Sequence, residues 1–473
     1  MTLFQPGENC WRVAQADTCD VLIDAENYFR SIRAAMLGAQ ERIILIGWDF
    51  DARVKMYDTQ GDVEGPLEIG EYLDWLVKRN ANLRIYILQW NLGALKLVKR
   101  GRTLSKVAQW LPHDRIQLKL DDDHPTGATQ HEKLIVVDRD IAFCGGIDIT
   151  ENRWDTREHN DTEERRTQPS GHDAGPWHDA STRLTGEVAK ALSDHAEHRW
   201  EQATGEKACD VASGPQSSKT GADGPAAIQG VEVAIARTRG ATEGAAEVRE
   251  IEALYCDIIA AAQDVIYIET QYLTAKRIVR SLAERLGEED GPEIVLVMPA
   301  TADGWLESQV MDSTRSRCIE ALRASDRFDR FRVYHPMAAK GADIYVHAKI
   351  LVADHRFLRI GSSNLSNRSM GFDSECDICV DARLADDPDA AARSIEYLRN
   401  DLIAEHIGSD TESVARSIED TNSLIASIEA ASKSGRCLRE YETPDLNTVQ
   451  EWLATNNILD PSSADDDRTS ITL

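Results

Sequence analysis

The chain has 473 residues, enough for two domains, and its formal net charge is −28. This acid excess opposes nonspecific binding to DNA or RNA and a broad electrostatic hold on anionic lipid surfaces, since both depend on Lys and Arg. No stretch approaches the roughly 18 apolar residues that span a bilayer, so we expect no transmembrane segment. The chain begins MTLFQPGE, which lacks the basic start and apolar run of a signal peptide, and its nine scattered cysteines favour a reducing compartment. We therefore expect a cytoplasmic or peripheral membrane protein, with secretion without a recognisable signal peptide as the alternative.

Strand-like and helix-like segments alternate along the chain in two similar series. The first series comprises strands at 39–46, 83–88 and 115–120 and helices at 25–39, 67–80 and 93–110. The second series comprises strands at 262–268, 293–298 and 332–334 and helices at 245–263, 275–287 and 304–325. Such alternation predicts an α/β fold in which helices cover a sheet, and the repetition predicts two similar halves.

A short constellation of residues occurs once in each half with identical internal spacing. It combines H-x-K with an Asp five positions later and a glycine-containing pair after six more residues. The first copy consists of His131, Lys133, Asp138 and Gly145-Gly146. The second copy consists of His347, Lys349, Asp354, Gly361-Ser362 and the following Ser363-Asn364. A lone H-x-K is a weak signal, but the whole string occurring twice is a strong one.

The residues around each motif predict a buried strand, at 131–137 (HEKLIVV) and at 347–353 (HAKILVA). On a strand, His131 and Lys133 point to the same face, and the same holds for the second copy. Each copy would then present an imidazole beside an ammonium. Exchange at a phosphodiester needs a nucleophile or base and also an acid. Two half-sites brought together by pseudo-two-fold symmetry would supply both.

The glycine-containing pairs, Gly145-Gly146 and Gly361-Ser362, each end a second apolar run. They allow a turn in which backbone N–H groups can approach a phosphate closely. We therefore expect Gly146 and Ser362 to contribute to binding of the substrate phosphate.

Composition divides the chain into four parts. They are a first half at 1–202, a linker rich in Gly, Ser, Ala and Lys at 203–228, a second half at 229–405, and a C-terminal part at 406–473. The C-terminal part is expected to be a helical appendage over 411–456 followed by a polar, acidic tail at 460–473.

Two further features are interpreted as ordinary structure. A run of basic residues would form one face of the helix at 93–110. The run comprises Lys96, Lys99, Arg100, Arg102 and Lys106. An ordinary solvated helix face is a simpler interpretation of this run than a phosphate or membrane contact. Cys376 and Cys379 lie in a strand-like run and would face opposite sides, which argues against a metal or redox pair. Neither motif supplies metal ligands at a usual spacing, so we expect no metal and no cofactor.

Together these residues resemble the phospholipase D superfamily, whose signature is the H-x-K-x4-D motif. The resemblance covers roughly residues 8–405 and looks like the two-motif phospholipases of the eukaryotic-like bacterial group, with supporting runs at 141–148, 153–156, 176–179, 268–272 and 361–370. It implies two α/β sandwich halves, each a mixed sheet flanked by helices, related by pseudo-two-fold symmetry, with one active site between them. It also implies a monomer and no metal requirement for the chemistry.

The resemblance further implies roles for the motif residues. By analogy, His131 attacks phosphorus to form a phosphohistidine, and His347 protonates the departing alcohol; the sequence alone does not order the two. Lys133, Lys349 and Asn364 would hold the non-bridging oxygens, where charge develops.

Four acidic residues are expected to support this site. A nucleophilic imidazole needs its far nitrogen held by an acceptor. Asp179 and Glu375, on strand-like segments after the two motif loops, are the candidates. Asp138 and Asp354 each follow a motif lysine by five positions, which places them on the opposite face of the strand. We therefore expect them to hold the turns rather than take part in catalysis.

The first motif loop carries Asp148 where the second carries Asn364. An ionised Asp aimed at a phosphate would repel it, so we expect Asp148 to turn away and to be structural at the site. His159, His172 and His178 follow the first motif and are interpreted as surface histidines rather than pocket residues.

Four functions are compatible with these residues. The leading one is a phospholipase D that acts on glycerophospholipids such as phosphatidylcholine at a membrane surface, with transphosphatidylation when a primary alcohol replaces water. A phosphatidyltransferase of the cardiolipin synthase type keeps the chemistry, but such relatives usually begin with membrane-spanning segments. A nuclease is disfavoured by the net charge and by Asp138 and Asp354, which the DNA-repair phosphodiesterases of the superfamily lack. A catalytically inactive binding protein is disfavoured because both His-Lys pairs are retained.

Overall fold

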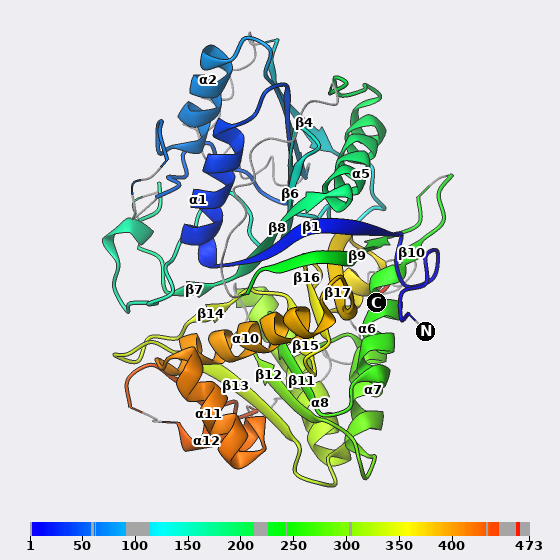
Figure 1. The fold of residues 1–473 in the computed structure, drawn as a ribbon, viewed down its shortest axis with the longest axis vertical. Coiled ribbons are helices and arrows are strands. Elements are labelled where there is room, and N and C mark those ends of the chain that lie inside the picture. The colour runs from blue at the N-terminus through cyan, green and yellow to red at the C-terminus, as the bar shows by residue number, and fades with distance from the viewer. Residues whose placement is uncertain are drawn as a thin grey trace.

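One mixed sheet runs through the computed structural model, from the first half of the chain to the second (Figure 1). The structure describes residues 2–57, 61, 63–90, 114–169, 171, 173–211, 226–242, 244–301, 305–431, 434–443 and 460–463. The expected helix at 93–110, with its basic run, lies outside the described residues, as does most of the expected linker.

The helices and strands follow the two series expected from the sequence. The first half contributes β1 (Arg12–Ile23), α1 (Asp24–Leu37), β2 (Arg42–Gly47), α2 (Ile69–Arg79), β3 (Arg84–Trp90), β4 (Ile116–Asp121), β5 (Leu134–Val137), β6 (Ile141–Gly145), the 3-10 helix η2 (Glu164–Arg166), β7 (Trp177–His178), β8 (Ala180–Gly186) and α5 (Glu187–Thr204). The second half contributes β9 (Ile228–Arg239), β10 (Val248–Arg249), α6 (Glu250–Ala261), β11 (Val265–Glu269), α7 (Lys276–Leu286), β12 (Glu293–Val297), α8 (Trp305–Ser325), β13 (Phe331–Met337), β14 (Tyr345–Val346), β15 (Ile350–Ala353), β16 (Phe357–Gly361), α9 (Asn367–Gly371), β17 (Glu375–Ala385) and α10 (Pro388–Ile407). The C-terminal part adds α11 (Thr411–Thr421), α12 (Leu424–Ala430) and β18 (Cys437–Glu440).

The strand order of the sheet is symmetric about its centre. Within the described residues, 16 strands pair in the order β18-β13-β12-β11-β15-β16-β17-β9-β1-β8-β6-β5-β2-β3-β4, with β10 attached to β9. The antiparallel pair β1–β9 lies at the centre, where the two long strands run side by side (Figure 1). On either side of it, each strand has a counterpart in the other half, and only β18 and β10 have none. The fold is therefore a mixed α/β sheet with pseudo-two-fold symmetry, as the repeat predicted.

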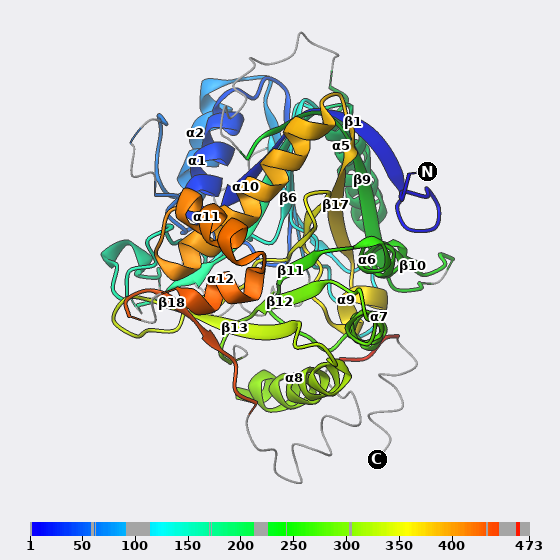
Figure 2. The same ribbon diagram turned by 60° about the horizontal axis from the view of Figure 1, so that its bottom comes forward.

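Helices cover both faces of the sheet. On one face, α5 and α10 pack over a single apolar cluster that continues across both halves, from Leu192 and Trp200 to Ile395 and Leu402. On the other face, α1 and α2 cover the first half, and α6, α7 and α8 cover the second. Figure 2 shows α10 with α11 and α12 beside its C-terminal end. The shared cluster means that neither half buries its core alone on that face.

Strand periodicity explains how the same apolar runs serve both faces. Ile43 and Leu45 of β2 pack toward α1 and α2, whereas Ile44 and Ile46 enter the shared cluster. Side chains of a strand alternate between its faces, so a continuous apolar run is what a strand buried on both sides requires.

The structure differs from the sequence-based expectation at two places. The motif strands begin at Leu134 and Ile350, so each motif His and Lys lies in the segment that precedes the strand rather than within it. The expected helix over 411–456 is also wrong in part, because Cys437–Glu440 forms the edge strand β18 against β13. Within the described part of the chain, no helix combines the length and apolarity needed to cross a membrane.

Candidate active site

Short backbone pairings between the two halves bring the motif copies together. Gln130 bridges to Ser374, and the N–H of His131 donates to the carbonyl of Ser374 at 2.9 Å. Symmetrically, β14 pairs in parallel with β7, and the N–H of His347 donates to the carbonyl of His178 at 2.8 Å. His131 therefore lies beside the segment of the second half that leads into Glu375, and His347 lies beside the segment of the first half that leads into Asp179.

The consequence is a crossed arrangement of imidazoles and carboxylates. Nδ1 of His131, from the first half, lies 3.0 Å from each carboxylate oxygen of Glu375, from the second half. Nδ1 of His347 lies 2.7 Å from Oδ2 of Asp179, from the first half. Both carboxylates are fully buried. Glu375 is itself fixed by the hydroxyl of Ser362, which donates at 2.5 Å. The two candidate acceptors thus contact the motif histidines, each across the interface between the halves.

Both motif histidines line one cavity of about 490 Å³. Their side chains retain 15% exposure for His131 and 6% for His347. Trp48 stands edge-on to His131 with ring centroids 6.3 Å apart, and Trp177 lies 5.2 Å from His347. The remaining lining residues are Trp90, Thr129, Arg153, Gln271, Tyr272, Met311, Asn364, Ser366, Arg368, Ser369 and Asp373. A cavity lined by both polar and aromatic side chains is suited to a ligand with a charged centre and apolar parts.

The surroundings favour neutral imidazoles. Burial, and then the charge of Lys133 and Lys349, lowers the pKa of His131 well below its ordinary value. Burial, and then Lys349 and Arg153, likewise lowers the pKa of His347. A neutral His131 whose Nδ1–H is directed to Glu375 keeps the lone pair of Nε2 for a reaction.

The two motif lysines differ in their partners. Nζ of Lys133 donates to the carbonyl of His131 at 2.8 Å and forms an ion pair with Asp148 at 3.1 Å. Asp148 also accepts from the N–H of Trp48 at 3.0 Å. Lys349 donates to the carbonyl of His347, and burial lowers the pKa of Lys349 to about 7. Asp148 is therefore engaged with protein donors, whereas the carboxylates that act on the charge of Lys349 are Asp179 and Glu375.

Asn364 takes the place in the second half that Asp148 takes in the first. It is 5% exposed and lines the cavity, and its Oδ1 has no hydrogen-bond partner within the described part of the chain. A neutral amide at the wall of the cavity can approach an anion without the repulsion that a carboxylate would bring.

Gly146 and Ser362 do not match the expectation that they bind phosphate. The N–H of Gly146 donates to the carbonyl of Ala180 at 2.8 Å, and the N–H and hydroxyl of Ser362 donate within the buried β16–β17 region. Glycine is required at 146 for another reason, because a Cβ there would collide with Oδ1 of Asp179. The motif glycine makes room for the carboxylate that holds His347.

Asp138 and Asp354 occupy equivalent positions in the turns directly after β5 and β15. The carboxylate of Asp138 accepts from the N–H groups of residues 40, 41 and 42, where β2 begins. The carboxylate of Asp354 accepts from the N–H groups of residues 263, 264 and 265, where β11 begins. Both residues have positive φ, of 49° and 56°. Each carboxylate therefore anchors an adjacent strand and a tight turn.

The interpretation of His159 and His178 as surface residues is wrong, because both are fully buried at the interface between the halves. They contact carboxylates from both halves, including Glu405 of α10. His172 lies outside the described residues. The runs RWDT and PWHD near His159 and His178 are local signals in the sequence. No local spacing connects these runs to Glu405, so the sequence did not indicate that contact.

Known proteins share both the motif-bearing region and the fold. The family profile described as "Cardiolipin synthase, PLD-like domain" matches residues 255–401, which include the second motif. Phospholipase D alpha 1 of Carica papaya is 22% identical over 480 residues, which cover 74% of this chain and 59% of that protein. Phospholipase D1 of Rattus norvegicus is 30% identical over 149 residues, which cover 30% of this chain and 13% of that protein.

Among solved structures, the crystal structure of phosphatidylserine synthase from Haemophilus influenzae Rd KW20 has the same fold. Its TM-score is 0.54 at 14% sequence identity, over 96% of this chain and 95% of that one. The chain spans less than two thirds of the length of the papaya and rat proteins. The duplicated H-x-K-x4-D motif, the symmetric sheet and these relatives support the phospholipase D superfamily as the family of this chain.

Proposed function

We propose that the protein is a phospholipase D that hydrolyses the distal phosphodiester bond of glycerophospholipids, such as phosphatidylcholine, to phosphatidic acid and a free alcohol. The observation that carries the proposal is one cavity lined by both motif histidines, each backed by a buried carboxylate from the opposite half. A nucleophile and an acid, each with a fixed tautomer, are what a two-step displacement at phosphorus requires.

In the first step, Nε2 of His131 attacks phosphorus, the P–O bond to the head group breaks, and His347 gives its proton to the departing oxygen. Glu375 stabilises the positive charge that develops on His131. His347 must be protonated for this step although burial lowers its pKa. The negative charge of a bound phosphodiester raises the pKa again, so protonation is coupled to substrate binding.

In the second step, His347 takes a proton from water, the hydroxide attacks phosphorus, and the P–N bond to His131 breaks. Phosphatidic acid leaves and both imidazoles return to their starting states. A primary alcohol in place of water gives a transferred phosphatidyl group by the same movements of atoms and protons.

The non-bridging oxygens of the phosphodiester would be held by Lys133, Lys349 and Asn364. A buried ammonium such as that of Lys349 is costly without a counter-charge, and an anionic phosphate supplies one. Arg153 and Arg368 line the cavity, and the two buried lysines donate to the carbonyls of its histidines, so positive groups gather here although the chain as a whole is strongly acidic.

The aromatic walls support a choline head group. Trp48 and Trp90 line the cavity and stack with centroids 6.0 Å apart, whereas Trp177, beside His347, already carries the guanidinium of Arg153 over its ring at 4.3 Å. Aromatic faces attract quaternary ammonium groups through their quadrupoles. Phosphatidylcholine is therefore the first substrate to test.

Phosphatidyl transfer to the alcohol of a second lipid is the competing function, favoured by the cardiolipin synthase description of the matching family profile. It shares the first step and differs only in the acceptor that resolves the intermediate.

A product screen on mixed phospholipid vesicles, with and without ethanol, separates these functions. We expect phosphatidic acid from phosphatidylcholine, and phosphatidylethanol when ethanol is added. Cardiolipin or another lipid-to-lipid product as the main species would replace the hydrolase by a transferase. No phosphatidyl product under any condition, or the same products from the His131→Asn variant, would contradict the proposal.

A further inference from the structure

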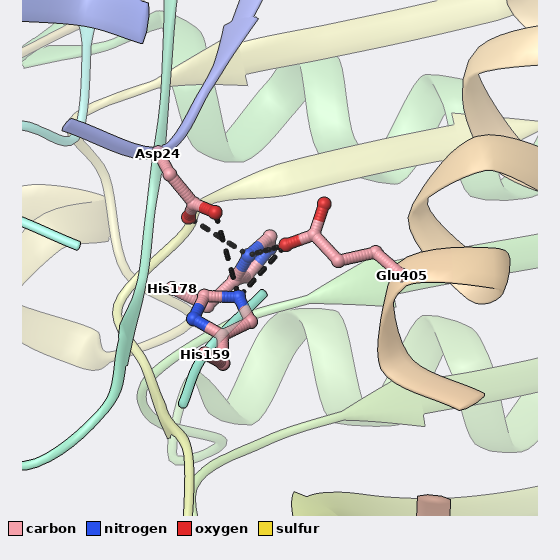
Figure 3. A group of neighbouring side chains, drawn as sticks. All are labelled: Asp24, His159, His178 and Glu405. Carbon is pink, nitrogen blue, oxygen red and sulfur yellow. Dashed lines mark hydrogen bonds and ion pairs between the residues drawn. The ribbon is translucent and has the colours of Figure 1, made fainter. Parts of the chain in front are cut away.

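Four buried side chains converge at the interface between the halves (Figure 3), and none of them is among the residues that line the reaction cavity. Asp24 at the start of α1, His159, and His178 in β7 come from the first half, and Glu405 in α10 comes from the second. Figure 3 shows two carboxylates and two imidazoles directed toward one another. One nitrogen or oxygen atom from each lies within 4.8 Å of all the others.

The separations of these atoms match those around a small metal ion. Oε1 of Glu405 lies 2.8 Å from Nε2 of His159 and 3.0 Å from Nδ1 of His178. The oxygens of Asp24 lie 3.4 Å from Nε2 of His159 and 3.2 Å from Nδ1 of His178. A tetrahedral ion with bonds of about 2.0–2.1 Å separates its ligand atoms by about 3.3 Å. The four side chains therefore need only small shifts to surround an ion.

Each imidazole is also supported on its far side, as metal-binding histidines usually are. Nδ1 of His159 lies 3.0 Å from Oδ2 of Asp155, which also accepts from Arg166 at 3.0 Å. Nε2 of His178 lies 2.7 Å from Oε2 of Glu269. Both outer carboxylates would fix the tautomer that leaves a lone pair directed into the cluster.

Hydrogen bonds alone satisfy both rings only if each imidazole carries a second proton. A neutral imidazole has one N–H, but each ring has carboxylates at both nitrogens. Oδ2 of Asp24 is fully buried and has no hydrogen-bond partner within the described residues. Asp24 and His159 also hold positive φ values of 63° and 42°, which residues other than glycine rarely adopt.

We propose that Asp24, His159, His178 and Glu405 bind one divalent transition-metal ion, and that this ion links the two halves. Two imidazole nitrogens and two carboxylate oxygens in a tetrahedral arrangement fit zinc best. Four protein ligands with no open position are typical of a structural site rather than a catalytic one. The ion takes no part in bond making at phosphorus.

The site would stabilise the catalytic geometry through the backbone next to it. The carbonyl of His178 accepts from the N–H of His347 at 2.8 Å, and Oδ1 of Asp24 accepts from the N–H of Asp179 at 3.2 Å. Two of the four ligands thus hold the segments that carry the second motif histidine and its carboxylate.

Metal analysis of the full-length chain tests the proposal. Protein produced in zinc-supplemented medium and passed over a chelating resin should retain about one zinc per chain, because a buried four-ligand ion exchanges slowly. Asp24→Asn and Glu405→Gln preserve side-chain size but should lose most of the metal. His195→Gln is the matched control, because His195 is a buried histidine with a carboxylate, Glu132, at 2.9 Å that lies outside the cluster.

Two measurements on the unaltered chain keep the test decisive if a variant does not fold. Crystals of the wild-type protein should give an anomalous difference peak at the zinc edge between the four side chains. Thermal unfolding should shift upward when zinc is supplied during refolding. A folded protein with less than about 0.1 ion per chain and no zinc-dependent shift would show that protons alone hold the cluster. Zinc retained by both ligand variants would place the metal elsewhere, and either result overturns the proposal.

Discussion

The crossed pairing makes a prediction that the two halves of the chain, considered separately, would not make. Asp179→Asn alters the first half but should impair His347, and Glu375→Gln alters the second half but should impair His131. The two variants should therefore show the kinetic defects of an acid and of a nucleophile, respectively. Their behaviour should follow the partner across the interface.

The contacts set the size of the effect. Each substitution removes a buried carboxylate that accepts from an imidazole at 2.7 Å or 3.0 Å. A hydrogen bond to a charged group contributes about 1.5–3 kcal/mol, or about 10- to 160-fold in rate. Loss of the correct tautomer adds to this, and the total can reach about 10⁴-fold. We therefore expect a loss of about 10²–10⁴-fold in kcat for each variant on phosphatidylcholine.

The assay compares phosphatidylcholine with phosphatidyl-p-nitrophenol, whose leaving group departs as an anion and needs no proton. Asp179→Asn should recover most of its lost rate on the nitrophenyl substrate, because the acid is no longer needed. Glu375→Gln should remain impaired on both substrates, because attack by His131 precedes either product.

Asp20→Asn serves as the control, since Asp20 is a buried carboxylate paired with Arg183 at 3.3 Å, and it should change neither rate greatly. Rescue of Glu375→Gln by the good leaving group would contradict the pairing of Glu375 with the nucleophile. Rescue of both variants to the same degree would also contradict it.

Three other perturbations test separate parts of the site. Asp148→Asn removes the ion-pair partner of Lys133 at 3.1 Å, so KM for a soluble phosphodiester should fall by about tenfold; an unchanged or higher KM would show that this lysine does not reach the phosphate. Asp354→Ala leaves three N–H groups at the start of β11 without their acceptor. It should therefore lower the free energy of unfolding in urea by about 1–3 kcal/mol with little change in kcat. A variant as stable as the unaltered protein would contradict the anchoring role of Asp354. Burial and the two motif lysines lower the pKa of His131, so its reactive neutral form should persist in mild acid. The acid limb of the kcat/KM profile against pH should therefore lie below the ordinary histidine pKa of about 6.5. An acid limb at or above that pH would contradict the buried, lysine-flanked environment of His131.

Much of the fold could be predicted from the sequence because its signals are local. The helices α1, α2, α6, α7 and α8 and the strands they cover follow from apolar periodicity, and the repeat gives the symmetry. The central pairing of β1 with β9 could not be predicted, since periodicity does not reveal which strand lies beside which. The edge strand at 437–440 was missed because four residues are too short to show a period.

The candidate site divides in the same way. The motif residues and both supporting carboxylates, Asp179 and Glu375, were identified from their positions on strands, but the sequence did not assign either carboxylate to a histidine. That assignment depends on the pairing of β7 with β14 and of Gln130 with Ser374, which only the tertiary structure contains. The cluster around His178 was missed for the same reason, because its members are distant in the sequence and share no spacing.

Direct capture of the covalent intermediate tests the central claim, that His131 is a nucleophile assisted by His347 in one shared site. The His347→Asn variant should be mixed with phosphatidyl-p-nitrophenol, quenched during turnover in denaturant without acid, digested and examined by mass spectrometry. We expect a phosphatidyl adduct on the peptide that carries His131, absent from the His131→Asn protein. An adduct on another residue, or none while nitrophenol is still released at the expected rate, would contradict it.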